Sequence, residues 1–381
     1  MSDTQKHTKP NVPNLRFPGF EGEWARCTLG EIGEPYIGLT YSPADVVNEG
    51  GTIVFRSSNI QNGEIDYSDI VRVNKKIKYS IITRKDDLLI CARNGSPRLI
   101  GKNALLKEAD AGQTFGAFML VFRSMDNHFV HQLLSTKGYY SQVSENLGAR
   151  INQITTSNIK DFEFYFPPST AERNKIAQFL DLIDERISIQ NKVIEKYESL
   201  IKAITRCLVH CNGHQCFLGD IAEIYQPKTI TGLEMSNGGQ YPVFGANGII
   251  GHYKDYNHAS PQICIACRGN TCGVLNYTLP FSWITGNSMV INVDSSASGV
   301  NKRFLFHLLS TVDYSPLISG SGQPQIVRGP LRKLRITLPD KQCQDKNAQI
   351  IDCLIEKSNV EKALLRKLQT QKNYFLTTVF I

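Results

Sequence analysis

The sequence lacks any run of consecutive apolar residues near the roughly 18–20 that a membrane-spanning helix needs. Residues 1–20 are polar and proline-rich without an apolar centre, so we expect no signal peptide. The ten cysteines follow no pattern of a secreted disulfide scaffold. These absences predict a protein that has reduced thiols in the cytoplasm and no membrane partner.

Sequence motifs of catalysis are missing as well. The chain has no Gly-x-x-x-x-Gly-Lys-Ser/Thr phosphate loop, no dinucleotide fingerprint, no Gly-x-Ser-x-Gly elbow and no His-Glu-x-x-His. Asp181, Asp184 and Glu185 are acidic neighbours, but they fall on the flank of a predicted helix, where solvated charges are normal. The sequence therefore predicts a non-catalytic protein without a cofactor of its own.

Metal binding is only weakly indicated. A compact group of zinc-type ligands lies near the middle of the chain: Cys207, His210, Cys211, His214 and Cys216. Nothing in the first half mirrors this group, so free thiols in a linker are the favoured interpretation, and we expect no metal. Cys264 and Cys267 fall in a predicted strand, where positions three apart point to opposite faces, so we expect small buried side chains.

The composition is that of a globular protein, with 41% hydrophobic and 9% aromatic residues. A length of 381 residues predicts two or three domains. The net charge of +7 permits a polyanionic partner but does not require one.

Gly and Pro are absent from residues 171–209, and apolar positions recur there at steps of three and four. Only a helix places such positions on one side. The predicted seam is Ile176, Phe179, Ile183, Ile187, Gln190, Ile194, Tyr197, Ile201, Ile204 and Leu208. We expect a spacer or docking rod here, since this helix is much longer than an ordinary core helix.

A second long helix is predicted over residues 347–380, with apolar positions at Ile351, Leu354, Leu365, Leu368, Phe375 and Val379. Ser358, Glu361 and Lys372 break this seam, so the helix needs a partner. The simplest arrangement pairs the two long helices as an antiparallel coiled coil.

The two halves of the chain repeat each other. Residues 218–221 repeat 29–32, 262–270 repeat 87–95, 304–311 repeat 129–136, and 334–339 repeat 162–167. Five ordered similarities, the long helices included, predict a tandem duplication. The expected fold class is α+β, with two α/β domains separated by two long antiparallel helices. The expected segments are an arm (1–23), a first domain (24–168), a central helix (169–210), a linker with the second domain (211–340) and a C-terminal helix (341–381).

Local patterns fill in the first domain. Residues 51–56, 87–92, 117–122 and 161–166 predict strands, and 129–143 predict one helix. Asn62-Gly63 predicts a hairpin turn.

Side chains that can contact nucleic acid follow the predicted strands of both halves. The first half offers Arg56, Ser58, Asn59, Arg93, Asn94, Ser96, Arg98, Lys102, Arg150, Asn152 and Gln153. The second half offers Arg268, Asn270, Thr271, Gln323, Gln325 and Arg328. Arg pairs bidentately with guanine, and Asn or Gln with adenine. An ordinary polar turn explains each residue equally well, but the matched groups favour DNA recognition.

The whole chain resembles the specificity (S) subunits of type I restriction-modification systems. The resemblance lies in Leu15-Arg16-Phe17-Pro18-Gly19-Phe20, Glu23-Trp24, residues 29–32 and 56–60, the Gly-x-x-x-x-Gln-Ile loop at 148–154, and Pro167-Pro168 before Glu172. Arg173 stands where the family usually has Gln after Glu, and residues 338–342 lack the Glu-Gln pair.

The resemblance implies two target recognition domains, each reading one half of a bipartite asymmetric DNA site. It implies that the paired helices set the spacer and dock two methyltransferase (M) subunits, through Ile176, Phe179, Ile183, Ile187, Ile194, Tyr197, Ile201, Ile351, Leu354, Leu365, Leu368 and Phe375. S-adenosylmethionine would belong to the M subunits, and ATP and Mg²⁺ to the partner subunits, including the restriction (R) subunits. The alternatives are a two-headed protein-binding adaptor and a nuclease with an unrecognised site.

Overall fold

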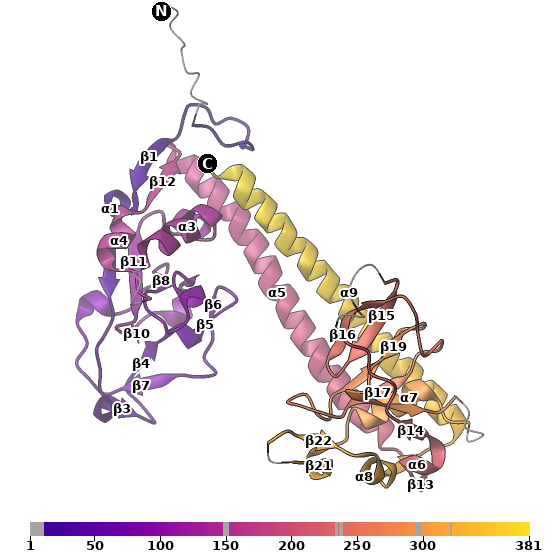
Figure 1. The fold of residues 1–381 in the computed structure, drawn as a ribbon. Helices are drawn as coiled ribbons and strands as arrows, with labels where there is room; N and C mark the ends of the chain where they lie inside the picture. Colours follow the sequence, from indigo (N-terminus) through magenta and orange to yellow (C-terminus); the bar gives the residue numbers. More distant parts are fainter. Residues whose placement is uncertain (1–10, 148–151, 233–234, 236–238, 295–298, 321) are drawn as a thin grey trace, which may run out of the picture. The chain divides into compact units, whose positions relative to one another are not determined.

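The structure, a computed structural model, describes residues 11–147, 152–232, 235, 239–294, 299–320 and 322–381. The chain divides into two compact units. Unit 1 comprises Met1–Lys192 and Ala363–Ile381, and unit 2 comprises Val193–Lys362. Each unit holds one globular head, residues 25–166 or 214–338, and a segment of both long helices (Figure 1).

Head 1 contains a four-stranded antiparallel sheet in the order β2-β11-β8-β9 and a second sheet in the order β10-β4-β7-β3, in which β10 and β4 are parallel. The strands are β2 Gly33–Ile37, β3 Val46–Val47, β4 Thr52–Phe55, β7 Val71–Val73, β8 Leu88–Cys91, β9 Asn103–Leu105, β10 Thr114–Phe115 and β11 Met119–Ser124. Every residue of β8 is buried, because Leu88 and Ile90 enter one core while Leu89 and Cys91 enter another.

The Asn62-Gly63 prediction is confirmed. β5 (Ile60–Gln61) pairs with β6 (Glu64–Ile65), and both turn residues have positive φ, 52° and 79°. Two positive φ angles define the type I′ turn that fits the twist of a hairpin.

The remaining elements of head 1 lie beside the first sheet. They are β1 Ala25–Thr28, α1 Leu29–Ile32, α2 Asn127–Leu133, α3 Lys137–Asn146, α4 Thr156–Asp161 and β12 Glu163–Phe166, with β1 and β12 paired antiparallel. The prediction of one helix over 129–143 is wrong. Thr136 has an extended backbone and its side chain accepts from the N–H of Tyr139, so it ends one helix and caps the next.

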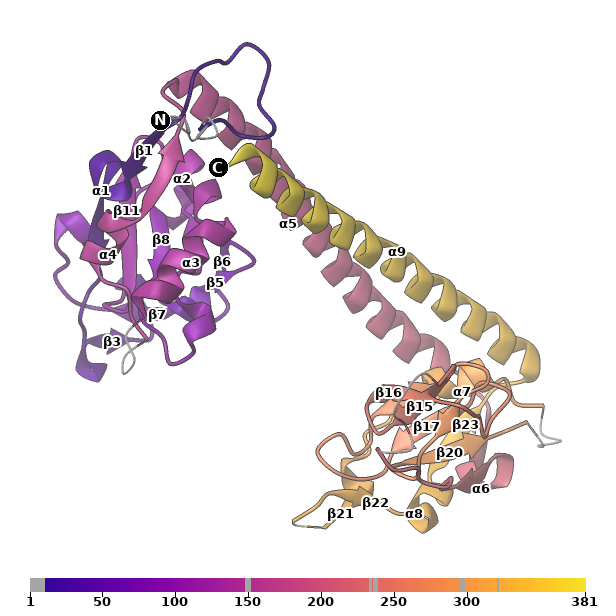
Figure 2. The ribbon, with the colours of Figure 1, turned by 45° about the horizontal axis from the view of Figure 1, so that its top comes forward.

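Head 2 repeats this topology. Its main sheet has the order β14-β20-β17-β18, β13 pairs with β23, and β15 lies between β16 and a parallel β19. Figure 2 labels β15, β16, β17, β20 and β23 of these strands. The strands and helices are β13 His214–Phe217, α6 Leu218–Ile221, β14 Glu223–Tyr225, β15 Tyr241–Gly245, β16 Gly248–Tyr253, β17 Ile263–Ala266, β18 Leu275–Tyr277, β19 Trp283–Ile284, β20 Ser288–Asn292, α7 Lys302–Leu309, β21 Ile318–Ser319, β22 Gln325–Ile326, α8 Arg328–Arg332 and β23 Arg335–Leu338. The predicted tandem repeat is therefore confirmed.

The two long helices are α5 (Thr170–Val209) and α9 (Lys341–Val379). In unit 1 the Phe179 and Phe375 rings lie 4.8 Å apart. In unit 2 the Asn347 side chain donates to the Leu208 carbonyl at 2.9 Å. Late residues of one helix meet early residues of the other in both units, which confirms the antiparallel pairing. None of the described helices combines the length and apolarity needed to cross a membrane.

The seam residues of both helices are covered. Ile176, Ile194, Ile351 and Leu368 are buried, and the other eight predicted docking residues are partly buried. Two positions that the sequence marked as breaks also belong to the seam. Ser358 is only 3% exposed, and Lys372 pairs with Asp184 at 2.5 Å.

A strap at residues 15–20 joins the ends of both helices in unit 1. The Leu15 N–H donates to the Thr378 carbonyl at 2.8 Å. The Arg16 guanidinium binds the buried Glu172 carboxylate through Nε at 2.7 Å and Nη2 at 2.8 Å. The strap thus contacts the start of α5 and the end of α9.

Candidate nucleic-acid interface

The polar loop after β8 meets the segment before α4. Arg93 and Gln153 form an isolated antiparallel bridge. The Asn94 N–H donates to the Asn152 carbonyl at 3.4 Å, and the Asn152 side chain donates to the Gly95 carbonyl at 3.2 Å. Two segments of the sequence prediction, 93–96 and 152–153, therefore lie side by side at one edge of head 1.

A third predicted segment joins them after β4. The Asn94 side chain donates to the Ser57 hydroxyl at 2.9 Å. The Arg93 guanidinium lies 4.9 Å from the centre of the Phe118 ring, and both side chains are exposed. Stacking on an aromatic face leaves the in-plane N–H donors of an arginine pointing outward. Phe118 was missed by the sequence interpretation because an apolar residue in a predicted strand indicates a core position.

A pocket of about 650 Å³ adjoins this surface. Its lining includes Tyr41, Arg56, Ser57, Ser58 and Phe118. The Arg56 guanidinium pairs with Asp69 at 2.8 Å, and one third of the side chain is exposed. Hydroxyl and guanidinium groups at the rim of such a pocket are suited to a phosphate or a base edge.

The prediction that Asn59 contacts DNA is wrong. Its side chain is fully buried, accepts from the Arg56 N–H at 2.9 Å, and donates to the carbonyls of Asp66 and Asp69. A side chain with no exposed surface cannot contact a base, so Asn59 anchors the β5–β6 hairpin instead.

The other predicted residues of head 1 lie elsewhere. Ser96 and Arg98 are exposed around the short 3-10 helix Pro97–Leu99. Lys102 lines a separate pocket between the head and the helix segments of unit 1. Arg150 falls outside the described residues.

Head 2 presents the same arrangement after the equivalent strand. Arg268 follows β17 and forms an isolated antiparallel bridge with Gln325. The Gly269 N–H donates to the Pro324 carbonyl at 3.0 Å. Beside this bridge, Asn270, Gln323 and Arg328 are exposed and Thr271 is partly exposed.

The two bridges are equivalent in detail. In head 1 the Ile154 N–H donates to the Ala92 carbonyl at 2.9 Å, and in head 2 the Ile326 N–H donates to the Cys267 carbonyl at 3.1 Å. Each head therefore holds one arginine and one glutamine in the same backbone register. The sequence predicted the matched loops but gave no signal that pairs Arg93 with Gln153.

In each unit, polar side chains of the head bind one aspartate of a long helix, and we call each such group a clamp. The clamp of unit 1 and the clamp of unit 2 lie at equivalent positions of the repeat. In unit 1, His128 Nδ1 lies 2.6 Å from Asp181, and Gln132 donates to Asp181 at 2.8 Å. In unit 2, Arg303 and His307 bind Asp352, with His307 Nε2 at 2.7 Å.

These contacts shift the titration of the clamps. The Asp181 hydrogen bond raises the pKa of His128. Burial alone would raise the pKa of Asp352, but hydrogen bonds from Arg303 and His307 lower it below the ordinary value. Both clamps therefore stabilise ionised groups.

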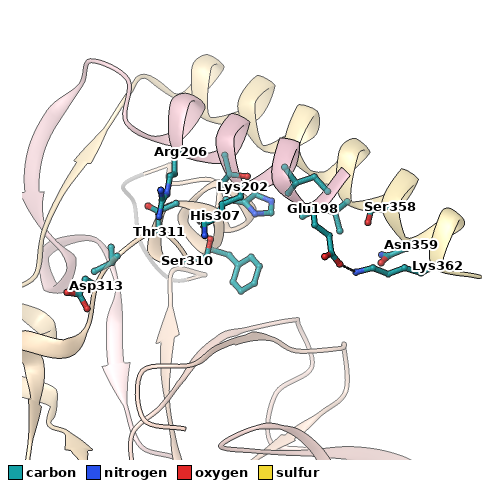
Figure 3. Close-up of a pocket in the computed structure, with 15 residues that line it drawn as sticks. Glu198, Lys202, Arg206, His307, Ser310, Thr311, Asp313, Ser358, Asn359 and Lys362 are labelled. Atoms are coloured by element: carbon teal, nitrogen blue, oxygen red, sulfur yellow. Dashed lines mark hydrogen bonds and ion pairs between the residues drawn. The ribbon is translucent and has the colours of Figure 1, made fainter. Parts of the chain in front are cut away.

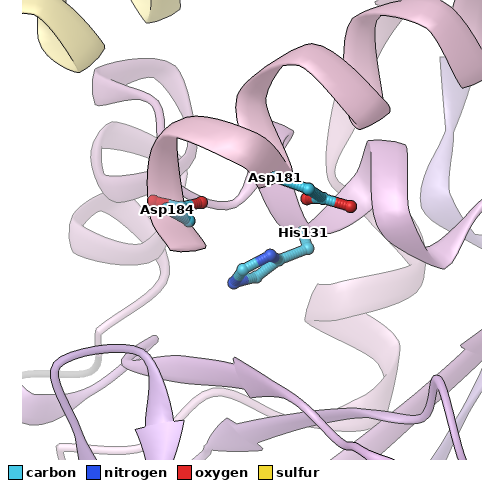
Figure 4. A group of neighbouring side chains, drawn as sticks. All are labelled: His131, Asp181 and Asp184. Carbon is cyan, nitrogen blue, oxygen red and sulfur yellow. The ribbon is translucent and has the colours of Figure 1, made fainter. Parts of the chain in front are cut away.

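His131, Asp181 and Asp184 gather beside the first clamp (Figure 4). Of the residues that the structure describes, they form the one group of three or more whose potential metal-ligand atoms lie within 4.8 Å of one another. Lys372 already neutralises Asp184, and Gln132 donates to both carboxylates. Burial lowers the pKa of His131 to about 4, so the ring is neutral. We interpret the group as a charge-balanced helix contact and propose no metal for it.

A groove of about 600 Å³ lies in unit 2 between α5, α7 and α9 (Figure 3). Lys202 and Arg206 project into it from α5, and Glu198 pairs with Lys362 at 2.6 Å across the two helices. The side chains that line the groove are a mixture of charged, polar and apolar residues.

Exposed apolar residues mark another face of the helices. Leu182 and Ile189 lie seven residues apart on α5 and are 65% and 54% exposed. That spacing places them on one helix face, away from the covered seam. The sequence interpretation missed them because it assigned apolar residues to the seam alone.

A family model of the type I restriction modification DNA specificity domain matches residues 21–199 and 215–370. The two matches correspond to the two repeats of the fold, and each covers a head with most of the long helix that follows it.

Three curated relatives are specificity subunits of type I restriction enzymes. The EcoprrI subunit of Escherichia coli is 30% identical over 112 residues, 29% of this chain and 27% of that protein. The EcoKI subunit of E. coli K12 is 27% identical over 194 residues, 49% of this chain and 41% of that protein. The StySPI subunit of Salmonella potsdam is 25% identical over 194 residues, 49% of this chain and 42% of that protein. The matches thus span less than half the length of each relative.

Two solved structures share the fold over nearly the whole chain. The S subunit of a type I restriction-modification system from M. genitalium has a TM-score of 0.66 and 19% identity, covering 97% of this chain and 99% of that one. A chain from a study of complex assembly and conformational transition of the type I R-M system has a TM-score of 0.54 and 15% identity, covering 96% and 98%.

Proposed function

Because this chain belongs to the family of type I restriction-modification specificity subunits, we propose that each head reads one half of a bipartite, asymmetric DNA site. The repeat of the Arg–Gln bridge in both heads carries this proposal. Arginine pairs bidentately with guanine, and glutamine with adenine, in the major groove. Because the two readers lie in one chain and their loops differ in sequence, they suit a site whose two halves differ in sequence.

The loops around each bridge differ enough to read different bases. Head 1 places Asn94 and Asn152 beside Arg93, whereas head 2 has Gly269 and Pro324 at the corresponding contacts. The two heads therefore hold the Arg–Gln pair in the same backbone register but surround it with different residues. Two related heads that read half-sites of different sequence require this combination.

We propose that the long helices set the length of DNA between the half-sites. α5 is a continuous helix of 40 residues that begins in unit 1 and ends in unit 2. A helix of this length measures about 60 Å at about 1.5 Å per residue. A continuous helix resists bending, so it suits a fixed spacer.

We propose further that methyltransferase subunits dock on the exposed face of the helices. Of the twelve docking residues named from the sequence, four are buried within the chain itself and the other eight are partly buried. Leu182 and Ile189 are the better candidates, since exposed apolar side chains gain most from burial in an interface. Methyl transfer, with S-adenosylmethionine, and ATP-driven cleavage would belong to the partner subunits.

The proposal is tested by expressing this chain with its cognate methyltransferase subunit and mapping adenine methylation across the host DNA. We expect one two-part motif with a fixed gap and different sequences on its two sides. A continuous or palindromic motif would contradict the two-reader account. A stable complex that neither binds nor methylates DNA would favour the adaptor alternative.

Docking is tested separately with Leu182→Asp combined with Ile189→Asp. We expect the double variant to fold and bind DNA but to lose the methyltransferase subunit during gel filtration. Ser199→Asp is the matched control, because Ser199 is exposed on another face of α5. Equal loss of the partner in the control would show that charge on the helix, not the apolar face, decides assembly.

A further inference from the structure

Two thiols from distant segments meet where α5 ends and α9 begins. Cys211 lies two residues beyond Val209, the last residue of α5, and Cys343 lies in the first turn of α9. They are 132 residues apart in sequence, both belong to unit 2, and their sulfur atoms lie 3.9 Å apart. Both side chains are partly exposed, so a small reagent can reach them.

Asn347 holds this pair in place. Its side-chain amide lies 3.3 Å from the Cys343 sulfur and 4.0 Å from the Cys211 sulfur, and it also donates to the Leu208 carbonyl. One residue of α9 thus binds the end of α5 and both thiols.

We propose that Cys211 and Cys343 form a reversible intrachain disulfide when the protein meets a thiol oxidant. The two sulfur atoms must approach from 3.9 Å to about 2.05 Å. Cys211 lies in the short bend between α5 and β13, where the backbone is less constrained than in a helix. A modest local movement therefore closes the bond.

The chemistry balances with a two-electron oxidant such as diamide. One thiolate attacks the oxidant, the second displaces it, and the two sulfur atoms become joined. The two electrons and the two thiol protons pass to the azo bond of diamide, which becomes a hydrazine. Burial and the adjacent Cys343 raise the pKa of the Cys211 thiol, so a smaller fraction of it is thiolate at neutral pH than in a free cysteine.

The bond would tie the end of α5 to the start of α9. A cross-link that closes a long loop removes much of the entropy of the unfolded chain. Oxidation should therefore raise the thermal stability of unit 2, and a dithiol reductant should reverse the change.

The test treats the full chain with diamide, blocks the remaining thiols with N-ethylmaleimide and analyses tryptic peptides by mass spectrometry. Cys207, Cys211 and Cys216 share the peptide 207–228, and Cys343 lies in the peptide 342–346. We expect these peptides to be linked in the wild type and in Cys207→Ser and Cys216→Ser. We expect the link to disappear in Cys211→Ser and in Cys343→Ser.

A melting curve of the same samples supplies the second measurement. The oxidised wild type should melt several degrees above the reduced form, and Cys211→Ser should show no such difference. Absence of the linked peptide from the oxidised wild type would overturn the proposal. So would a link that persists at wild-type yield in Cys211→Ser.

Discussion

Arg93 and Gln153 face each other across a single antiparallel bridge at the edge of head 1. The bridge uses backbone groups, so it fixes the position of both residues without engaging their side chains. The same register recurs at Arg268 and Gln325. Side chains held in this way can be changed with little effect on folding, which makes them suitable for testing DNA recognition.

Arg93→Ala should weaken binding to the recognised DNA by about 5- to 150-fold, the loss of one bidentate contact of about 1–3 kcal/mol. Titration of labelled DNA at fixed salt measures the change. Arg84→Ala is the control, because Arg84 is also exposed and its guanidinium also lies over an exposed aromatic ring, that of Tyr79. An equal loss in both variants would mean that general charge, not a placed arginine, carries the binding.

Gly38→Ala should destabilise head 1 by several kcal/mol, on the order of the largest single-residue effects. An added Cβ would lie 2.2 Å from the Gly116 carbonyl oxygen, and the backbone of Phe115 is almost as close. Gly329→Ala is the control, since nothing lies within 4 Å of its added Cβ in α8. Urea unfolding of the two variants should differ clearly, and similar midpoints would contradict the packing described here.

Glu172→Gln should cost about 3–5 kcal/mol, because it leaves the Arg16 charge without its buried partner. Glu172 is 1% exposed and Arg16 is 13% exposed at the side chain. Arg26→Ala breaks the exposed pair with Glu163 and should cost under about 1 kcal/mol. Comparable losses in thermal melting would show that the strap is not anchored through Glu172.

The His128 clamp and the Asp352 clamp should lose their contributions to folding stability at opposite ends of the pH range. The pKa of His128 is raised above 6.5, so its contribution is complete below that pH and disappears as pH rises through the raised value. The pKa of Asp352 is lowered below 3.8, so its contribution is present above 3.8 and disappears as pH falls through the lowered value.

Melting curves over pH measure these contributions by difference. The difference in melting temperature between wild type and His128→Asn should be large in mildly acidic buffer and small in alkaline buffer. The difference in melting temperature between wild type and Asp352→Asn should be large at neutral pH and small in strong acid. A difference that stays constant over pH in either variant would mean that the substituted side chain acts through packing, not charge.

Much of the fold follows from local patterns in the sequence. The long helices, the repeat and the Asn62-Gly63 turn are each set by periodicity or by the backbone demands of a few neighbouring residues. The helix break at Thr136 was missed because the apolar pattern of 129–143 continues across it, and only the cap contact reveals the boundary. Lys372 looked like a seam defect because its partner, Asp184, is remote in sequence.

The candidate site was less accessible to sequence reasoning. Arg93 could be selected by chemistry, but its pairing with Gln153 depends on how the loops fold back on the sheet. Asn59 had the right chemistry for reading a base, yet its amide is used within the hairpin. Whether a polar side chain serves recognition or local structure is decided by burial, which the sequence alone does not specify for a loop.

The most direct test compares the methylation motifs of Arg93→Ala and Arg268→Ala, each co-expressed with the methyltransferase subunit. The account predicts that Arg93→Ala relaxes the sequence requirement in one half of the motif, while Arg268→Ala relaxes it in the other half. The gap between the halves should stay unchanged in both variants. Relaxation of the same half by both substitutions, or of both halves by either one, would contradict the assignment of one reader to each head.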